Sequence, residues 1–245
     1  MVADATLVRR LRAALEAAGD PERAAGQQAY MKSSMPFHGI TSPELRRIVD
    51  PLFREHAPSD RQTWEGTVRE LWDAATHREE RYAALALAGH RSARAWQGPD
   101  VLGLHRHLVV TGAWWDLVDE TATRLVGPVL LAHRATVTPV MDAWAVEDDL
   151  WMRRTAILSQ LKHRGETDTA LLQRCVVANL EGSPYGAEFF IRKGIGWALR
   201  EHAKTDAGWV LRLVAREQDR MSGLTVREAT KHRSPAELVA AGLMP

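Results

Sequence analysis

The chain of 245 residues is 45% hydrophobic and 26% charged, which is typical of a globular protein. Its single cysteine, Cys175, excludes an internal disulfide framework and any zinc site built from several thiolates. Charged residues interrupt the only apolar run at the N-terminus, and no segment approaches the ~20 apolar residues that span a bilayer. We therefore expect neither a signal peptide nor a membrane span, and a protein of the cytoplasm.

The net charge of +1 conceals an uneven distribution along the chain. Residues 153–233 contain 15 Lys and Arg against 9 Asp and Glu, whereas residues 1–152 contain 17 against 21. A basic region suits a polyanion such as nucleic acid, because each neutralised phosphate releases counterions. The alternative is that these charges are solvated helix faces.

Helical periodicity runs through almost every segment between turn signals, and no stretch shows sustained strand-like alternation, which predicts an all-α fold. The first helix is expected over residues 6–18, with a cap at Thr6 and an end at Gly19-Asp20-Pro21. Another begins at Thr41, where Thr-Ser-Pro-Glu has the pattern of a capping box. The later helices are expected over residues 61–75, 79–89, 100–110, 114–131, 137–144, 149–161, 168–180, 188–202, 207–217 and 225–231.

Small residues recur at comparable places in four of these helices, Ala84, Ala122, Ala156 and Gly194, with spacings of 38, 34 and 38 residues. A period of this length with two helices per unit is close to that of HEAT and armadillo solenoids. The sequence therefore predicts one domain over residues 1–245, a right-handed α-solenoid of HEAT-like repeats with a concave face. Chance spacing among Ala-rich helices is the alternative.

Residues 114–119 read WWDLVD, an unusual pairing of adjacent tryptophans with two carboxylates. The helical period places Trp115 and Asp119 on one face, while Trp114, Leu117 and Val118 fall on the neighbouring stripe. This predicts a core stripe beside an exposed edge of indole and carboxylate. The alternative is that Trp115 packs in the core and Asp119 caps a helix or pairs on the surface.

Five further stretches carry a likeness to a known family: YMKSSMPFHGI at 30–40, RELWD at 69–73, LWMRRTAILSQLKH at 150–163, EFFIRKGIGWALREHAKT at 188–205 and TVREATKH at 225–232. Together with WWDLVD, they resemble the AlkD family of HEAT-like-repeat DNA alkylation repair glycosylases, over about residues 30–231. The resemblance implies a monofunctional enzyme that releases N3- and N7-alkylated purines from duplex DNA. It implies no metal and no organic cofactor, and a base that is not enclosed, so that bulky adducts can be accepted.

The resemblance also implies roles for individual residues. The family's catalytic carboxylate falls on Asp119, its two tryptophans on Trp115 and Trp197, and its arginine on Arg154, which would hold a phosphate or orient Asp119. Tyr30 matches a tyrosine at the DNA groove. Two features depart from the pattern: His38 stands where an apolar residue is expected, and the loop before Trp197 is lengthened. Expected DNA contacts in the basic segments are Lys32, Arg192, Lys193, Arg200, Lys204, Arg227 and Lys231.

Two other classes of function compete with a glycosylase: a non-catalytic HEAT-like protein that binds DNA structures, and a protein-binding solenoid. Asp119 together with both tryptophans argues against the first, and the basic half of the chain argues against the second. His105-Arg-His107 lacks a third ligand at metal spacing, so it predicts no metal site. We expect a monomer that is associated with the nucleoid in a prokaryote. The other tryptophans are expected in core or capping positions, namely Trp64, Trp72, Trp96, Trp144, Trp151 and Trp209.

Overall fold

The computed structural model describes residues 2–243, and all the regular structure in this range is helical. The all-α prediction is confirmed, and the succession of short helices is consistent with an α-solenoid. The chain divides into two compact units, the first ending at Gln97 and the second beginning at Gly98. None of the described helices combines the length and the apolar character that crossing a membrane requires.

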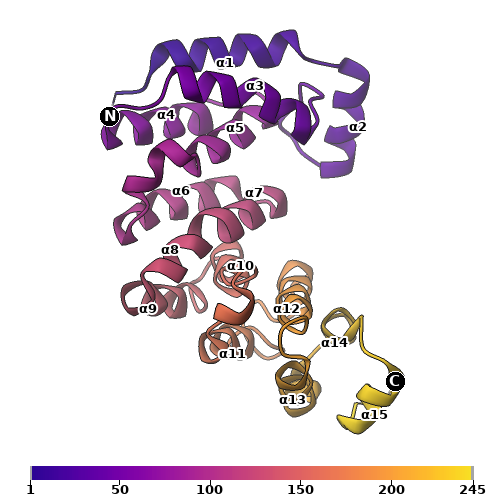
Figure 1. Ribbon diagram of the computed structural model, residues 1–245. Helices are drawn as coiled ribbons and strands as arrows, with labels where there is room; N and C mark the ends of the chain where they lie inside the picture. The colour runs from indigo at the N-terminus through magenta and orange to yellow at the C-terminus, as the bar shows by residue number, and fades with distance from the viewer. Residues whose placement is uncertain (1, 244–245) are drawn as a thin grey trace. The chain divides into compact units, whose positions relative to one another are not determined.

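The first unit has a core of leucines and aromatic rings, and Figure 1 shows its helices from indigo to purple. Leu7 and Leu11 are fully buried, as are Trp64 and Trp72, so both tryptophans occupy the predicted core positions. The helices that contribute this core are α1 (Ala5–Ala17), α2 (Pro21–Met31), α3 (Ser42–Glu55), α4 (Arg61–Asp73) and α5 (Arg78–Ala88), followed by a 3₁₀ turn at Arg91–Trp96.

Helix caps in this unit partly match the sequence analysis. The capping box of Thr41 and Glu44 is confirmed at the start of α3. The prediction that Thr6 caps α1 is wrong, because the side chain of Asp4 accepts from the N–H groups of Thr6 and Leu7. Asp20 caps α2, which sequence analysis did not predict.

The segment that carries His38 is anchored by a buried carboxylate. Glu79 on α5 accepts the backbone N–H groups of His38 (2.9 Å), Gly39 (2.9 Å) and Ile40 (3.1 Å). The His38 ring stacks on that of His77, with centroids 3.8 Å apart. At the position where an apolar side chain was expected, His38 therefore forms a stacked imidazole pair with His77.

The second unit carries WWDLVD and the basic segment of residues 153–233. Cys175 is buried, and burial raises the pKa of its thiol to about 12. Trp144 is also buried. The α-helices are α6 (Leu102–Gly112), α7 (Trp115–Glu120), α8 (Gly127–Ala132), α9 (Arg134–Trp144), α10 (Leu150–Leu158), α11 (Thr169–Val177), α12 (Phe189–His202), α13 (Ala207–Glu217), α14 (Gly223–Thr230) and α15 (Pro235–Ala240).

Within this unit, α7 adjoins α10, α10 adjoins α12 and α12 adjoins α14 (Figure 1). The small residues Ala122, Ala156 and Gly194 are all buried along this series. Gly196 allows the closest approach, since a Cβ there would lie 2.5 Å from the Cβ of Glu228 on α14. Gly196 therefore permits the close packing of α12 on α14.

Candidate functional site

WWDLVD enters its helix through a tight turn. Helix α6 ends at Gly112, Ala113 has a left-handed backbone (φ +39°), and the extended Trp114 is the N-cap of α7. Leu117 and Val118 are fully buried, as predicted. The turn thus fixes the start of α7, and Asp119 follows Trp115 by one helical turn.

Trp114 lies in an aromatic cluster rather than in the leucine core. Its ring centroid is 6.1 Å from that of Trp151 and 5.5 Å from that of Phe190, and the last two rings are 5.0 Å apart. All three side chains are half-buried. The prediction that Trp114 lies in the core with Leu117 and Val118 is therefore wrong, and Trp151 belongs to the same half-buried cluster. No hydrogen-bond acceptor within the described range reaches the buried Trp114 Nε1.

Asp119 and Arg154 form a two-pronged ion pair between α7 and α10. Arg154 Nε donates to Asp119 Oδ1 (2.7 Å), and Arg154 Nη2 donates to Asp119 Oδ2 (2.8 Å). The arginine side chain is only 4% exposed and the aspartate side chain 12% exposed. Parallel hydrogen bonds of this kind fix the plane and direction of the carboxylate.

The same guanidinium ties in the start of α12. Arg154 Nη1 donates to the backbone carbonyl of Phe190. One turn later, Gly194 leaves room for the arginine, because a Cβ at this position would lie 2.9 Å from Nη1. Three of the five guanidinium N–H groups are therefore committed within the protein. The geometry shows Arg154 orienting Asp119, and a phosphate contact would have to use the two remaining hydrogens.

Burial raises the pKa of Asp119 above its ordinary value. The hydrogen bonds and charge of Arg154 oppose this effect, and the charge of Asp116 adds to it. Desolvation penalises the ionised form, while the guanidinium stabilises it. Asp119 is thus a partly dehydrated carboxylate whose side chain is 12% exposed, which suits the stabilisation of a developing positive charge.

A π-helical segment, η3 (Thr121–Val126), begins two residues after Asp119. Thr121 Oγ1 donates to the carbonyl of Leu117 and Thr123 Oγ1 to that of Asp119, each at 2.8 Å. These bonds satisfy carbonyls where the hydrogen-bond ladder changes register. Single π turns occur frequently at functional sites.

The two candidate tryptophans lie on helices that meet Arg154. Trp115 is the first residue of α7 and is half-buried, as is Asp119. Trp197 is half-buried on α12, three residues after Gly194. Both tryptophans are therefore partly exposed. Trp115 lies on the helix of Asp119, and Trp197 lies on the helix whose Phe190 carbonyl accepts from Arg154.

Several of the predicted DNA contacts already have protein partners. Lys193 Nζ lies 2.5 Å from Glu228 Oε1, and Arg200 pairs with the other oxygen of Glu228. Arg192 pairs with Glu181 (2.9 Å). The two cations lower the pKa of Glu228, with the Lys193 hydrogen bond as the main cause. Sequence analysis missed this shared carboxylate, for which no local signal exists.

Other basic candidates remain available. Arg227 and Lys231 are exposed, and no described carboxylate pairs with either. In the first unit, Tyr30 is 77% exposed on α2, and Lys32 ends that helix with a left-handed backbone (φ +50°). Lys204, by contrast, already has a protein partner, because its Nζ lies 2.6 Å from a carboxylate oxygen of Glu201.

One group has the donor set of a metal site, with the ligand atoms of His38, His77 and Glu80 all within 4.8 Å of one another. Both carboxylate oxygens of Glu80 are already in use, since Arg12 Nε (2.7 Å) and Thr76 Oγ1 (2.7 Å) donate to them. The two imidazoles stack at an interplanar angle of 15°, so one ion could not lie in both ring planes. This arrangement is that of a capped helix start.

His105 is fully buried on α6, and burial lowers its pKa to about 3.

Comparison with known proteins gives a consistent family. The profile of the family described as "DNA alkylation repair enzyme" matches residues 11–232. The chain belongs to this DNA alkylation repair enzyme family. A solved structure described as a predicted DNA alkylation repair enzyme from Enterococcus faecalis superimposes with a TM-score of 0.77 at 29% identity, covering 88% of this chain and 97% of that one. A search of curated proteins gave no significant match. Membership in the DNA alkylation repair enzyme family gives the protein a role in repairing alkylated DNA, and hence an interaction with DNA.

Proposed function

We propose that the protein is a monofunctional DNA glycosylase that hydrolyses the N-glycosidic bond of N3- and N7-alkylated purines in duplex DNA. The observation that carries this proposal is Asp119, a carboxylate with 12% exposure whose two oxygens are aligned by Arg154. The family match gives the biological context in which such a carboxylate acts.

Alkylation at N3 or N7 gives the purine a positive charge, so the base is already a good leaving group. When the C1′–N bond breaks, its electron pair stays with the purine and neutralises that charge. The deoxyribose then acquires oxocarbenium-like character, as in other glycoside hydrolyses. The enzyme's main task is therefore at the sugar and not at the base.

Asp119 is proposed to face this sugar. Its negative charge stabilises the cationic C1′, and its oxygen accepts a proton from the attacking water as the new C1′–O bond forms. Arg154 keeps the carboxylate ionised and correctly oriented. The electron-rich faces of Trp115 and Trp197 pack on the sugar and attract the cation, which contributes roughly 0.5–2 kcal/mol per ring.

DNA binding is proposed to use basic and aromatic side chains from each of the two units. Arg227, Lys231 and Lys32 contact phosphates, and Tyr30 lies at the groove. Lys193 and Arg200 contribute through the positive field that surrounds Glu228. The protein acts as a monomer in the cytoplasm, on the nucleoid in a prokaryote, and needs no cofactor.

The test is incubation of the wild-type protein with duplex DNA that contains 7-methylguanine. A monofunctional glycosylase releases free 7-methylguanine and leaves an abasic site, and the strand breaks only after alkali. Removal of the methyl group without loss of the base would contradict the proposal. Tight binding without any product would instead support the non-catalytic DNA-binding alternative.

Chemistry at the sugar also bears on the size of the lesion that the enzyme accepts. If catalysis acts on the sugar and no pocket encloses the base, a bulky N3-alkyladenine is released as well as a methylated one. A parallel excision assay with the two substrates checks this. Release of methylpurines alone would show that the base is enclosed.

A further inference from the structure

One carboxylate on α14 pairs with two cations on α12. Lys193 Nζ lies 2.5 Å from Glu228 Oε1, and Arg200 Nη1 donates to Glu228 Oε2. The Glu228 side chain is 15% exposed, against 42% for Lys193 and 22% for Arg200. No other described carboxylate pairs with either cation. Glu228 therefore cancels half of the positive charge that these two side chains would otherwise present.

A glycine sets the position of Glu228 between the two cations. Lys193, Gly196 and Arg200 share one face of α12, because residues three, four and seven apart lie on the same side of a helix. A Cβ at Gly196 would lie 2.5 Å from the Cβ of Glu228 and 3.1 Å from the carbonyl oxygen of Thr225. Gly196 therefore allows α14 to place its carboxylate one helical turn from each cation.

The packing of α14 on α12 does not depend on these ion pairs alone. Thr225 is 1% exposed, and its Oγ1 donates to the backbone carbonyl of Arg192 (3.2 Å). Ion pairs between partly exposed side chains contribute little to the stability of a folded protein. Lys193 and Arg200 can therefore exchange the carboxylate for another anion while the two helices stay packed.

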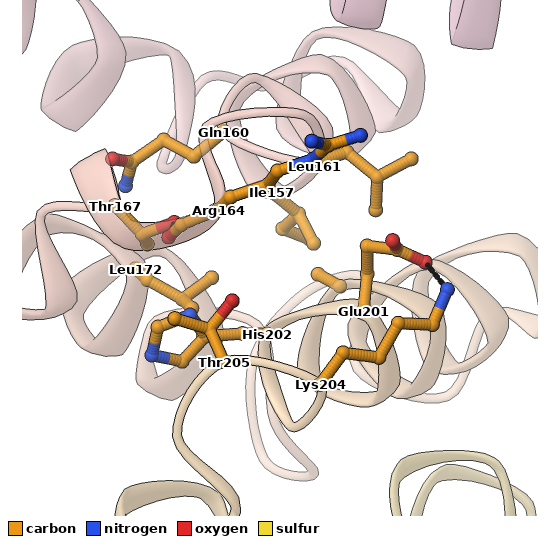
Figure 2. Close-up of a pocket in the computed structure, with 11 residues that line it drawn as sticks. Ile157, Gln160, Leu161, Arg164, Thr167, Leu172, Glu201, His202, Lys204 and Thr205 are labelled. Atoms are coloured by element: carbon orange, nitrogen blue, oxygen red, sulfur yellow. Dashed lines mark hydrogen bonds and ion pairs between the residues drawn. The ribbon is translucent and has the colours of Figure 1, made fainter.

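Further cations belong to the same two helices. Arg227 precedes Glu228 on α14, and Lys231 follows it by one turn; both are exposed, and no described carboxylate pairs with either. Glu201, the acidic residue within α12, pairs with Lys204 beside a separate pocket (Figure 2). Cations therefore outnumber carboxylates on α12 and α14, and such a surface attracts the phosphates of any DNA sequence.

We propose that Glu228 restrains nonspecific DNA binding by competing with backbone phosphates for Lys193 and Arg200. This inference rests on the DNA-binding surface of the proposed function, and it adds the residue that limits the affinity of that surface. Nonspecific affinity comes almost entirely from phosphate contacts, so the restraint acts on undamaged DNA of any sequence. A protein that must find rare lesions in a long duplex thereby dissociates sooner from undamaged DNA.

The affinity of undamaged duplex DNA for the wild type and for Glu228→Gln, measured by fluorescence anisotropy at several salt concentrations, tests the proposal. Glutamine keeps the shape of the side chain and removes its charge. Each additional neutralised phosphate steepens the slope of log affinity against log salt by about 0.9. We therefore expect the variant to bind about tenfold more tightly at about 100 mM salt, with a gain that shrinks about threefold between about 50 and 200 mM. A variant that binds no more tightly than the wild type, or a gain that is independent of salt, would overturn the proposal.

Glu217→Gln is the matched control. The Glu217 side chain at the end of α13 is also 15% exposed, and its oxygens lie 2.9 Å from Arg216 Nε and 3.6 Å from Arg220 Nη1. Neither arginine is an expected DNA contact. The control removes the same charge from a carboxylate that also pairs with two cations, and it should leave the affinity and the salt slope unaltered. Equal gains in the two variants would reflect the net charge of the whole protein and would contradict a specific role for Glu228.

Two further variants separate the restraint from a structural role. Glu228→Asp keeps the charge and should bind duplex as the wild type does. Glu228→Gln should give no gain when combined with Lys193→Met and Arg200→Met, because the cations that it would free are absent. Weaker binding by Glu228→Gln, together with a lower melting temperature, would show that the carboxylate only holds the surface together, and would overturn the proposal. Absence of 7-methylguanine release by the wild type would refute the glycosylase proposal, whereas these comparisons use undamaged duplex and remain valid.

Discussion

The ion pair of Asp119 and Arg154 predicts a separation of stability from catalysis. Asp119→Asn keeps the shape of the side chain but leaves a guanidinium that is only 4% exposed without its counter-charge. Removing one partner of a buried pair costs about 3–5 kcal/mol. Because the aspartate is 12% exposed and therefore not fully desolvated, we expect the lower end of that range. At roughly 2–4 °C per kcal/mol for a chain of this size, the melting temperature falls by about 6–12 °C.

The double variant Asp119→Asn with Arg154→Met should recover most of this loss, because no buried charge remains. Thermal unfolding of the wild type, both single variants and the double variant gives the coupling free energy. A matched control is Asp142→Asn, which breaks a similar two-pronged pair with Arg174 (2.8 and 3.0 Å) whose side chains are 37% and 49% exposed. That change should cost less than about 1 kcal/mol. Equal losses for the two aspartates, or a double variant no more stable than Asp119→Asn, would refute the reasoning.

Three further predictions follow from the same geometry. Excision should decline as pH falls through the pKa of Asp119, which burial raises above that of an ordinary aspartate. Arg154→Gln should move this decline to higher pH, because it removes the charge that stabilises the ionised carboxylate. Single-turnover rates with an unchanged pH dependence in the variant would contradict this. Gly194→Ala places a Cβ 2.9 Å from Arg154 Nη1, so it should destabilise the protein by about 1–3 kcal/mol and slow excision. A fully active variant would show that the Arg154 side chain can move aside without loss of function. Arg227→Ala and Lys231→Ala should each lower the slope of log affinity against log salt by about 1 on any duplex, and a residue whose change leaves the slope unaltered does not contact a phosphate.

Much of the fold follows from local sequence signals. The helix at residues 207–217 has the bounds predicted, because Asp206 caps it and its apolar residues keep a helical period. The helix α2 was missed because Gly19-Asp20-Pro21 was interpreted only as an end. The same Asp and Pro are also an N-cap and a favourable first residue for the next helix.

The short helix α15 was missed for a related reason. Ser234 and Glu237 form a capping box around Pro235, which is the same signal that identified the start of α3. The start of α15 was therefore predictable from the sequence. The π-helical segment after Asp119 could not be found, since a change of hydrogen-bond register leaves no mark on residue periodicity.

The candidate site was predicted as a set of residues but not as a geometry. Helical spacing places Trp115 and Asp119 on one face, and the resemblance to the AlkD family adds Arg154. Whether Arg154 faces Asp119 or the solvent depends on the space left by Gly194 and on the carbonyl of Phe190, both far along the chain. Contacts between helices of this kind are tertiary, so no local pattern encodes them.

The aromatic cluster illustrates the same limit. The stripe of Trp114, Leu117 and Val118 predicts Trp114 in the core, and Trp151 is expected in a core or capping position. In the structure these two rings and that of Phe190 pack together at the edge of the site and remain half-exposed. An apolar stripe predicts which side chains avoid water, but not which of them end where the core meets a functional surface.

The most direct test of the proposed mechanism is single-turnover release of 7-methylguanine from duplex DNA by the wild type and by Asp119→Asn, measured below the melting temperature of the variant. The proposed mechanism predicts that the variant binds the duplex with an affinity close to that of the wild type but releases the base at least about a hundredfold more slowly. Release at the wild-type rate by the folded variant would contradict a role for the Asp119 charge in catalysis.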